Sequence, residues 1–210
     1  MKLSIVIPVY QAEKLIDELI SRITIEMKSL FENYEIILIE DGSNDNSWFK
    51  IKEHCIKNKK IKGIKLSRNF GQHNAITAGL KESCGNKVIV MDCDLQHNPK
   101  YIPKFIEESN KGFDVVYSNM KSRSFGVFKN LTSFIFFKIY NYLIDNKKFI
   151  GSNKMGSFSL ISRKVVLEYL KFGDYARHYL MVLRWLGFNS SIIQIEHDDR
   201  LSGNSSYTCL

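Results

Sequence analysis

Long hydrophobic runs are missing from this sequence of 210 residues. A membrane-spanning helix needs roughly 18 or more apolar residues in a row, and the nearest approach, residues 131–144, is broken by Lys138 and Asn141. The opening MKLSIVIPVY is short, contains Pro8 and lacks the small-residue cleavage site of a secretory leader. We therefore expect a chain that does not cross a membrane and that begins with a buried strand.

Cysteine is scarce, and its spacing shows no pairs. Cys55, Cys84, Cys93 and Cys209 match neither a zinc site nor a secreted disulfide framework, which favours a reducing compartment and predicts a cytoplasmic protein. The motif Gly-x-Gly-x-x-Gly is also absent after the first apolar run, where residues 8–10 read PVY. This absence argues against a dehydrogenase that binds a nucleotide cofactor.

Acidic residues are outnumbered, because 22 Asp and Glu stand against 30 Lys and Arg and leave a net charge of +8. A positively charged protein attracts nucleic acid, anionic lipid or phosphorylated substrates. No aromatic RNA-binding signature, zinc-finger spacing or heptad repeat accompanies the charge, so we expect no nucleic-acid partner. A Lys-rich solvated surface accounts for part of the excess whatever the function.

Short apolar runs alternate with longer amphipathic stretches through the first half of the chain. Runs of this kind are typical of strands buried on both faces of a parallel sheet, and they cover Leu3–Val9, Glu35–Ile39, Ile61–Leu66, Lys87–Met91 and Phe113–Tyr117. The stretches between them carry apolar residues at helical spacing and lie near Ala12–Leu30, Asn44–Asn58, Gln72–Ser83 and Pro99–Asn110. The pattern predicts an α/β fold with an open, mainly parallel central sheet.

Helix punctuation and composition agree with one folded unit. Asn98 precedes Pro99 as an N-cap precedes a first-turn proline, and Gly85 and Gly112 stand where helices would end. With 44% apolar and 25% charged residues, the chain can bury one hydrophobic core. We therefore expect a single domain over residues 1–210.

The pattern changes after about residue 118 to a basic and aromatic stretch without a strand-like run. Phe134, Phe137, Lys138 and Tyr142 would alternate around a helix with basic flanks, which suits a helix at a lipid interface. A helix buried against the sheet explains the same spacing equally well. Further strands and helices are expected at Ser157–Ile161, Lys164–Lys171, His178–Trp185 and Ser190–Glu196.

Candidate site residues follow the expected strands. Ligands of open parallel sheets gather outside the carboxyl ends of the strands, which here precede Tyr10, Asp41, Arg68–Asn69, Asp92–Asp94 and Ser118–Lys121. Asp92 and Asp94 are one residue apart and can point toward one Mg²⁺ or Mn²⁺, and Gln96 can add a carbonyl oxygen. Such a cation neutralises the charge of a departing diphosphate.

Asp41-Gly42-Ser43 is a second candidate, after the second expected strand. An acidic side chain there can accept a hydrogen bond from a base N–H, and the glycine permits a tight turn. A helix N-cap by Ser43 or Asn44 explains the same residues.

Five segments together resemble the family 2 glycosyltransferases, and more narrowly the polyprenyl-phosphate glycosyltransferases, the group of dolichyl-phosphate mannosyltransferase. The segments are SIVIPVY (4–10), EDGS (40–43), LSRNFGQHNAITAGL (66–80), MDCDLQHNP (91–99) and RLSGNSSY (200–207). The resemblance implies a GT-A (Rossmann-like) nucleotide-sugar-binding fold and inversion at the anomeric carbon. It also implies a nucleotide-binding half over residues 1–117 and an acceptor half over residues 118–210.

The resemblance further implies roles for the matching residues. Contacts to the nucleotide-sugar are expected from Pro8, Tyr10, Glu13, Asp41, Arg68, Gln72 and Asp92. Metal binding is expected from Asp92, Asp94 and Gln96, and catalytic roles from Asp92, Asp94 and Arg200. Contacts to the acceptor phosphate are expected from Lys121, Arg123, Lys129 and Ser133, since cations beside an aromatic helix suit a lipid-linked phosphate. A solvated basic loop is the alternative for this last group.

Ser157 departs from the family pattern. Many relatives carry Gly-Asp-Phe-Arg where this chain has Gly-Ser-Phe-Ser at residues 156–159, so the acidic residue often proposed as a base is absent. A phosphate monoester, with its second pKa of about 6, is largely ionised at neutral pH and needs little help to attack. An alcohol acceptor would need a base. The departure therefore favours a phosphate nucleophile, or an altered enzyme.

Together these features predict an inverting, metal-dependent glycosyltransferase that transfers a sugar from a nucleotide-sugar to polyprenyl (undecaprenyl) phosphate. We expect it to be peripheral at the cytoplasmic face of the plasma membrane. One alternative is a glycosyltransferase with a saccharide hydroxyl acceptor in surface polysaccharide synthesis, and another is a nucleotide-sugar-binding module that has lost turnover. The sequence does not reveal the sugar, the base or the oligomeric state.

Overall fold

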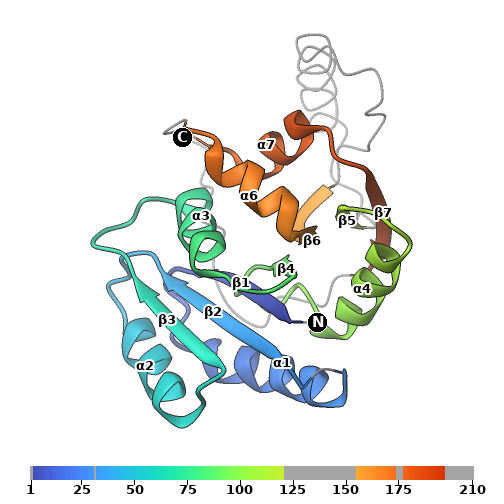
Figure 1. The fold of residues 1–210 in the computed structure, drawn as a ribbon. Coiled ribbons are helices and arrows are strands. Elements are labelled where there is room, and N and C mark those ends of the chain that lie inside the picture. Colours follow the sequence, from blue (N-terminus) through green and yellow to red (C-terminus); the bar gives the residue numbers. More distant parts are fainter. Residues whose placement is uncertain (1, 31, 121–154, 174–176, 197–210) are drawn as a thin grey trace, which may run out of the picture.

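The computed structural model describes residues 2–30, 32–120, 155–173 and 177–196 (Figure 1). Within these ranges seven strands form one sheet in the order β3-β2-β1-β4-β6-β5-β7. The strands are β1 Leu3–Val9, β2 Tyr34–Glu40, β3 Ile61–Lys65, β4 Lys87–Val90, β5 Val115–Met120, β6 Met155–Ser162 and β7 Ser190–Ile195. The helices are α1 Ile16–Leu30, α2 Ser47–Lys57, α3 Gln72–Glu82, the 3₁₀ turn η1 Pro99–Tyr101, α4 Ile102–Asn110, α6 Arg163–Lys171 and α7 Tyr179–Leu186.

The parallel part of the sheet is centred on β1. It pairs in parallel with β2 on one side and with β4 on the other, and β2 pairs in parallel with β3. Every residue of β1 and β2 is buried, as expected of strands covered on both faces. β5 begins later than predicted and continues to Met120, so Ser118 lies inside the strand and is buried, not beyond its end.

Among the described strands, β6 alone runs antiparallel to its neighbours. It lies between β4 and β5 and so separates two strands that follow one another along the chain. β7 then pairs in parallel with β5 at the edge of the sheet. The sheet is mainly parallel, as predicted, with one inserted strand that the sequence pattern did not place.

Helices cover both faces of the sheet (Figure 1). One cluster of buried residues joins α1, α2 and α4 to the first face, through side chains such as Ile51 and Phe105. A second cluster joins α3, α6 and α7 to the opposite face, through side chains such as Ile76 and Val165. In β1, Leu3, Ile5, Ile7 and Val9 belong to the first cluster and Val6 belongs to the second, as the two-residue period of a strand requires.

The sequence analysis predicted one helix start correctly and one helix end incorrectly. The Asn98 side chain accepts a 3.0 Å hydrogen bond from the Lys100 N–H and caps η1, as predicted. Gly112 follows α4 with a φ of +101°. However, α3 ends at Glu82, so the prediction that Gly85 ends this helix is wrong.

Cys55, Cys84 and Cys93 are free thiols, and Cys209 lies outside the described residues. None of the helices within the described ranges has the length and apolar character needed to cross a bilayer.

Candidate active site

The carboxyl ends of three adjacent strands bring predicted site residues to one edge of the sheet. β2, β1 and β4 are parallel neighbours, so Asp41, Tyr10 and Asp92, which follow them, emerge at the same edge. The Asp41 N–H donates a 2.9 Å hydrogen bond to the Val9 carbonyl, which continues the pairing into the loops. The Tyr10 side chain is 39% exposed at this edge.

Both carboxylate oxygens of Asp92 accept short hydrogen bonds from neutral donors. Gln72 Nε2, at the start of α3, lies 2.6 Å from Oδ1, and Ser157 Oγ, on β6, lies 2.6 Å from Oδ2. The Asp92 side chain keeps 29% of its surface exposed. Neutral donors orient a carboxylate without cancelling its charge, and each oxygen retains acceptor capacity. Asp92 is therefore an oriented and accessible anion.

The contact between Asp92 and Ser157 follows from the register of β6. The antiparallel pairing of β4 with β6 sets Val90 opposite Ser159. Continued by two residues, this register places Ser157 opposite Asp92. The position at which the sequence lacks the family carboxylate is therefore in direct contact with the first aspartate of the Asp-x-Asp motif.

His97 holds the backbone of Asp92. It is 2% exposed, its ring stacks on Phe158 with centroids 5.0 Å apart, and its Nδ1 accepts a 3.1 Å hydrogen bond from the Asp92 N–H. An accepting Nδ1 carries no proton, so its 3.8 Å approach to Asp92 Oδ2 is not an ion pair. Sequence reasoning gave His97 no role, although it stands in the segment MDCDLQHNP.

Asp94 begins a tight turn after β4. Its Oδ1 accepts a 3.1 Å hydrogen bond from the Gln96 N–H, and Leu95 between them has a φ of +62°. A leucine in this left-handed conformation is uncommon and persists only where its surroundings hold it. Leu95 is 2% exposed and belongs to the core cluster beneath α1 and α4, so packing fixes the turn that presents Asp94.

The oxygen atoms at this turn suit a hard divalent cation. Asp92 and Asp94 supply carboxylates and Gln96 an amide carbonyl, the ligand types that Mg²⁺ and Mn²⁺ prefer. Burial, and then the charge of Asp92, raise the pKa of Cys93 to about 12, so this neighbour stays a neutral thiol and offers no thiolate ligand. Within the described ranges, no group of three or more His, Cys, Asp or Glu side chains is arranged to hold a metal. A cation here would take its further oxygen ligands from a phosphate or from water.

Asp41 ties the loop after β2 to the segment before α3. Its carboxylate accepts hydrogen bonds from the N–H groups of Phe70 at 2.7 Å and Gly71 at 2.9 Å. The side chain is only 3% exposed, and this burial raises the pKa of Asp41 above its ordinary value despite the two hydrogen bonds. Gly42 has a φ of +69°, and a Cβ there would lie 2.4 Å from the backbone carbon of Arg68. The two loops are thus locked together at close range.

The start of α2 is organised by Glu13, a predicted nucleotide contact. Its carboxylate accepts 3.1 Å hydrogen bonds from the backbone N–H and the side-chain amide of Asn46, which is the N-cap residue of α2. The alternative interpretation that Ser43 or Asn44 is the N-cap of α2 is therefore wrong. Glu13 links the loop after β1 to the loop after β2.

Arg68 and Pro8, also predicted nucleotide contacts, differ in exposure. Arg68 is exposed, and its guanidinium lies 4.4 Å from the centroid of the Phe70 ring, a cation–π arrangement that orients its planar group. Pro8 is buried within β1, opposite Ile39 of β2.

His73 and His178 form a ring pair that sequence reasoning left without a role, and His73 interacts electrostatically with Asp92. His73 follows Gln72 in the first turn of α3, and its ring centroid lies 4.1 Å from that of His178, which precedes α7. Burial, and then the charge of His178, lower the pKa of His73, whereas Asp92 acts in the opposite direction. His73 stands in the family segment LSRNFGQHNAITAGL, which could have marked it as a site residue. Its partner His178, at the start of α7, was not predictable from the sequence.

The other predicted contacts lie outside the described residues. They are Lys121, Arg123, Lys129, Ser133 and Arg200. Their roles stay predictions.

Comparison with known proteins places this geometry in a family. A model described as "Glycosyl transferase family 2" matches residues 4–170. The "Uncharacterized glycosyltransferase YkcC" of Bacillus subtilis is 35% identical over 205 residues, which cover 97% of this chain and 62% of that relative. An undecaprenyl-phosphate 4-deoxy-4-formamido-L-arabinose transferase of Aeromonas hydrophila is 32% identical over 207 residues, with 97% and 62% covered. The chain thus spans less than two thirds of the length of both relatives.

A solved structure shares the architecture. Glucosyl-3-phosphoglycerate synthase from Mycobacterium tuberculosis, crystallised with Mn²⁺, uridine diphosphate and phosphoglyceric acid, matches with a TM-score of 0.65 at 16% sequence identity. The match covers 95% of this chain and 71% of that one. A likeness at this identity concerns the fold, which is GT-A, as the sequence predicted.

Proposed function

This chain belongs to glycosyl transferase family 2, and we propose that it transfers a sugar, with inversion, from a nucleotide-sugar to polyprenyl phosphate at the cytoplasmic face of a membrane. The observation that carries the proposal is the orientation of Asp92 by Gln72 and Ser157 at the ligand-binding edge of the sheet. The name of the Aeromonas relative, an undecaprenyl-phosphate transferase, supports the choice of acceptor.

The loops after β1, β2 and β3 would bind the nucleotide. Tyr10 offers an exposed aromatic ring at this edge, and the exposed guanidinium of Arg68 suits a diphosphate, which it can meet with several N–H donors. Asp41 would contact the base through the acceptor capacity that its bonds to Phe70 and Gly71 leave free.

Asp92, Asp94 and Gln96 would hold Mg²⁺ or Mn²⁺, which when bound supplies positive charge against the charge of the departing diphosphate. The protein's own contribution is to fix the ligands beforehand. Gln72 and Ser157 orient the Asp92 carboxylate, and the buried Leu95 turn presents Asp94. Groups fixed in advance need no reorganisation during the reaction, which is the main source of electrostatic catalysis.

The acceptor chemistry needs no protein base at position 157. A phosphate oxygen would form the new bond to the anomeric carbon, and the electron pair of the breaking bond would pass to the diphosphate oxygen. A phosphate monoester has a second pKa of about 6 and is largely a dianion at neutral pH, so the attacking oxygen carries no proton to remove. The Ser157 hydroxyl donates to Asp92, which fits a positioning role. A saccharide hydroxyl would need a base.

The test is a panel of UDP-, GDP- and CMP-sugars with Mn²⁺, offered polyprenyl phosphate in one series and oligosaccharides in the other. Released nucleotide and glycosylated product are both measured. The proposal predicts a glycolipid and no oligosaccharide product, and Lys129→Ala should lower glycolipid formation. Transfer to oligosaccharides alone would assign the other acceptor class, and donor binding without any product would identify a binding module; either result contradicts the proposal.

A further inference from the structure

A second surface of the molecule combines exposed apolar side chains with positive charge, far along the sheet from β6. Phe49 and Ile56 on α2 are 56% and 85% exposed. They are seven residues apart, so they lie on the same side of the helix, opposite the buried residue Ile51. Large apolar side chains gathered on one helix face mark an interaction site more often than scattered ones do.

The sequence segment that contains this pair is rich in lysine. Residues 50–65 contain a single carboxylate, Glu53, and seven lysines, namely Lys50, Lys52, Lys57, Lys59, Lys60, Lys62 and Lys65. Several of these have local partners: Lys50 pairs with Asp17 at 2.8 Å, and Lys62 pairs with Glu35 at 2.7 Å. The segment therefore carries much of the excess positive charge of the chain.

Three of the lysines remain available for a partner. Within the part of the chain that the structure describes, the exposed ammonium groups of Lys52, Lys57 and Lys59 make no ion pair or hydrogen bond. We call Phe49, Lys52, Ile56, Lys57 and Lys59 the α2 surface. Its composition, apolar side chains among unpaired lysines, is that of a helix at the surface of an anionic bilayer.

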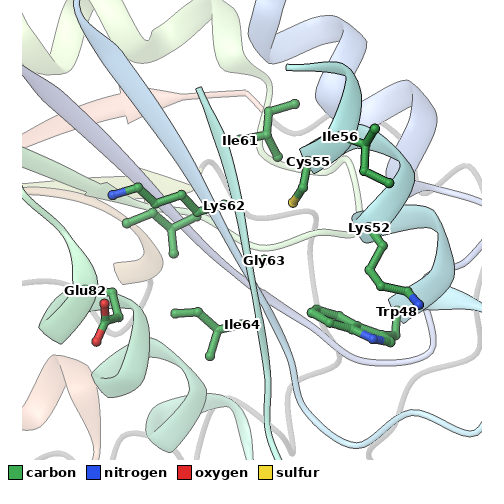
Figure 2. A pocket seen from close by; sticks show the side chains of 10 residues that line it. Trp48, Lys52, Cys55, Ile56, Ile61, Lys62, Gly63, Ile64 and Glu82 are labelled. Carbon is green, nitrogen blue, oxygen red and sulfur yellow. The ribbon is translucent and has the colours of Figure 1, made fainter. Parts of the chain in front are cut away.

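A cavity adjoins the α2 surface. It measures about 580 Å³ and lies along β3, the edge strand of the sheet. Its lining includes the apolar side chains Trp48, Ile61 and Ile64 together with Lys52 and Ile56 of the α2 surface (Figure 2). Apolar space is thus open directly beside a lysine, an arrangement that can admit the acyl region of a lipid whose phosphate meets the ammonium group.

Protection of the edge strand explains only part of this pattern. Lysines on an edge strand discourage pairing with a strand of another molecule, which accounts for Lys62 and Lys65 on β3. It does not account for the exposed Phe49 and Ile56, which lie on α2. A second copy of the chain is a poor occupant, because two α2 surfaces in contact would oppose their unpaired lysines.

We propose that the α2 surface docks on an anionic phospholipid bilayer, with Phe49 and Ile56 among the headgroups and the lysines on lipid phosphates. The proposal adds a membrane contact to the donor-binding half and rests on the proposed function in one respect, that a lipid-linked acceptor brings the enzyme to a membrane. It is distinct from the basic stretch after residue 118, for which the family resemblance predicts contacts to the acceptor.

The first test is binding of the full chain to vesicles of phosphatidylcholine with and without phosphatidylglycerol, without donor. Lys52→Gln/Ile56→Ser should weaken binding to the anionic vesicles by about tenfold or more, since one lysine near such a surface contributes about fivefold and the apolar side chain adds to it. Lys81→Gln/Leu167→Ser makes the same chemical change at exposed residues of α3 and α6 and should bind like the parent. Equal losses in the two variants would overturn the proposal.

The second test locates the contact. Quenching by brominated lipid is compared between Ile56→Trp and Leu167→Trp, which share the native Trp48 and Trp185. Stronger quenching of Ile56→Trp is expected, and equal quenching contradicts docking through α2. The proposal is also contradicted if the parent chain does not bind vesicles but forms dimers that Lys52→Gln/Ile56→Ser abolishes. The α2 surface would then be the contact with a second copy of the chain. Nucleotide binding is also measured without vesicles. A chain that binds nucleotide but does not dock through α2 contradicts the docking proposal and leaves the proposed function intact.

Discussion

The Ser157 hydroxyl on β6 and the Asp92 carboxylate beyond β4 are 65 positions apart in sequence and meet through a 2.6 Å hydrogen bond. The relatives' pattern would place a carboxylate at residue 157, directly against Asp92. Two adjacent carboxylates repel, and one of them then takes up a proton more readily. With serine, Asp92 faces a hydrogen-bond donor in place of a second carboxylate.

Ser157→Ala is predicted to lower kcat/KM by about tenfold or more, since a hydrogen bond to a charged group contributes roughly 1.5–3 kcal/mol. The loss arises because Asp92 is no longer held on its Oδ2 side. Ser162→Ala is the matched control, because Ser162 is on the same strand but lies away from the site. Its hydroxyl donates a 3.1 Å hydrogen bond to Asp114. Steady-state turnover checks both variants. Unchanged turnover in Ser157→Ala would show that this hydrogen bond does not serve catalysis.

Gly42→Ala is predicted to weaken nucleotide binding, whereas Gly112→Ala is not. Both glycines have positive φ, +69° and +101°, so either alanine is strained by roughly 1–2 kcal/mol. Only at Gly42 would the new Cβ meet backbone, 2.4 Å from the carbon of Arg68, while nothing lies within 4 Å at Gly112. Displacing the Arg68 loop should cost at least about tenfold in nucleotide affinity, measured by calorimetry. Equal nucleotide affinities in the two variants would show that the Arg68 loop does not contribute to nucleotide binding.

The lowered pKa of Glu35 predicts that the free energy of unfolding decreases in acid. Burial alone would raise the pKa of this carboxyl, but hydrogen bonds from Lys62, Ser4 and the Cys84 N–H outweigh it and lower the pKa to about 2. A lowered folded-state pKa means that the stabilisation is complete above the unfolded value, 4.5, and is lost as the pH falls toward 2. The contribution is about 3 kcal/mol at neutral pH.

Urea unfolding at a series of pH values checks this prediction. The parent chain should lose free energy of unfolding steeply below about pH 4.5, and Glu35→Gln should start lower at neutral pH and lose less on acidification. Parallel pH profiles for the two chains would show that Glu35 is not the titrating group.

Local sequence pattern was sufficient to predict most of the elements in residues 1–117. Leu3–Val9 was predicted as a strand and is one, because a continuous apolar run between turn residues is a local signal. The order of the strands is not a local property. The insertion of β6 beside β4 depends on pairings such as Val90 with Ser159, whose partners are distant in the sequence.

The same distinction applies to the site. Motif spacing located Asp92 and Asp94, since both follow one strand. The contacts that hold Asp92 were not predicted as contacts, because Gln72, His97 and Ser157 reach it from α3, from the following turn and from β6. Ser157 was noted from the sequence as a departure from the family pattern, but its contact with Asp92 became visible only once the antiparallel register placed the two residues opposite each other.

We propose that Asp92 and Asp94 bind a divalent cation together with the donor diphosphate. Calorimetric titration of UDP and GDP with and without Mn²⁺ tests it most directly, in the parent chain, in Asp94→Asn and in the control Asp114→Asn. We expect Mn²⁺ to tighten binding of one nucleotide by at least about tenfold in the parent and in Asp114→Asn, and to have no effect in Asp94→Asn. The same Mn²⁺ effect in all three chains, or none in the parent, would contradict it.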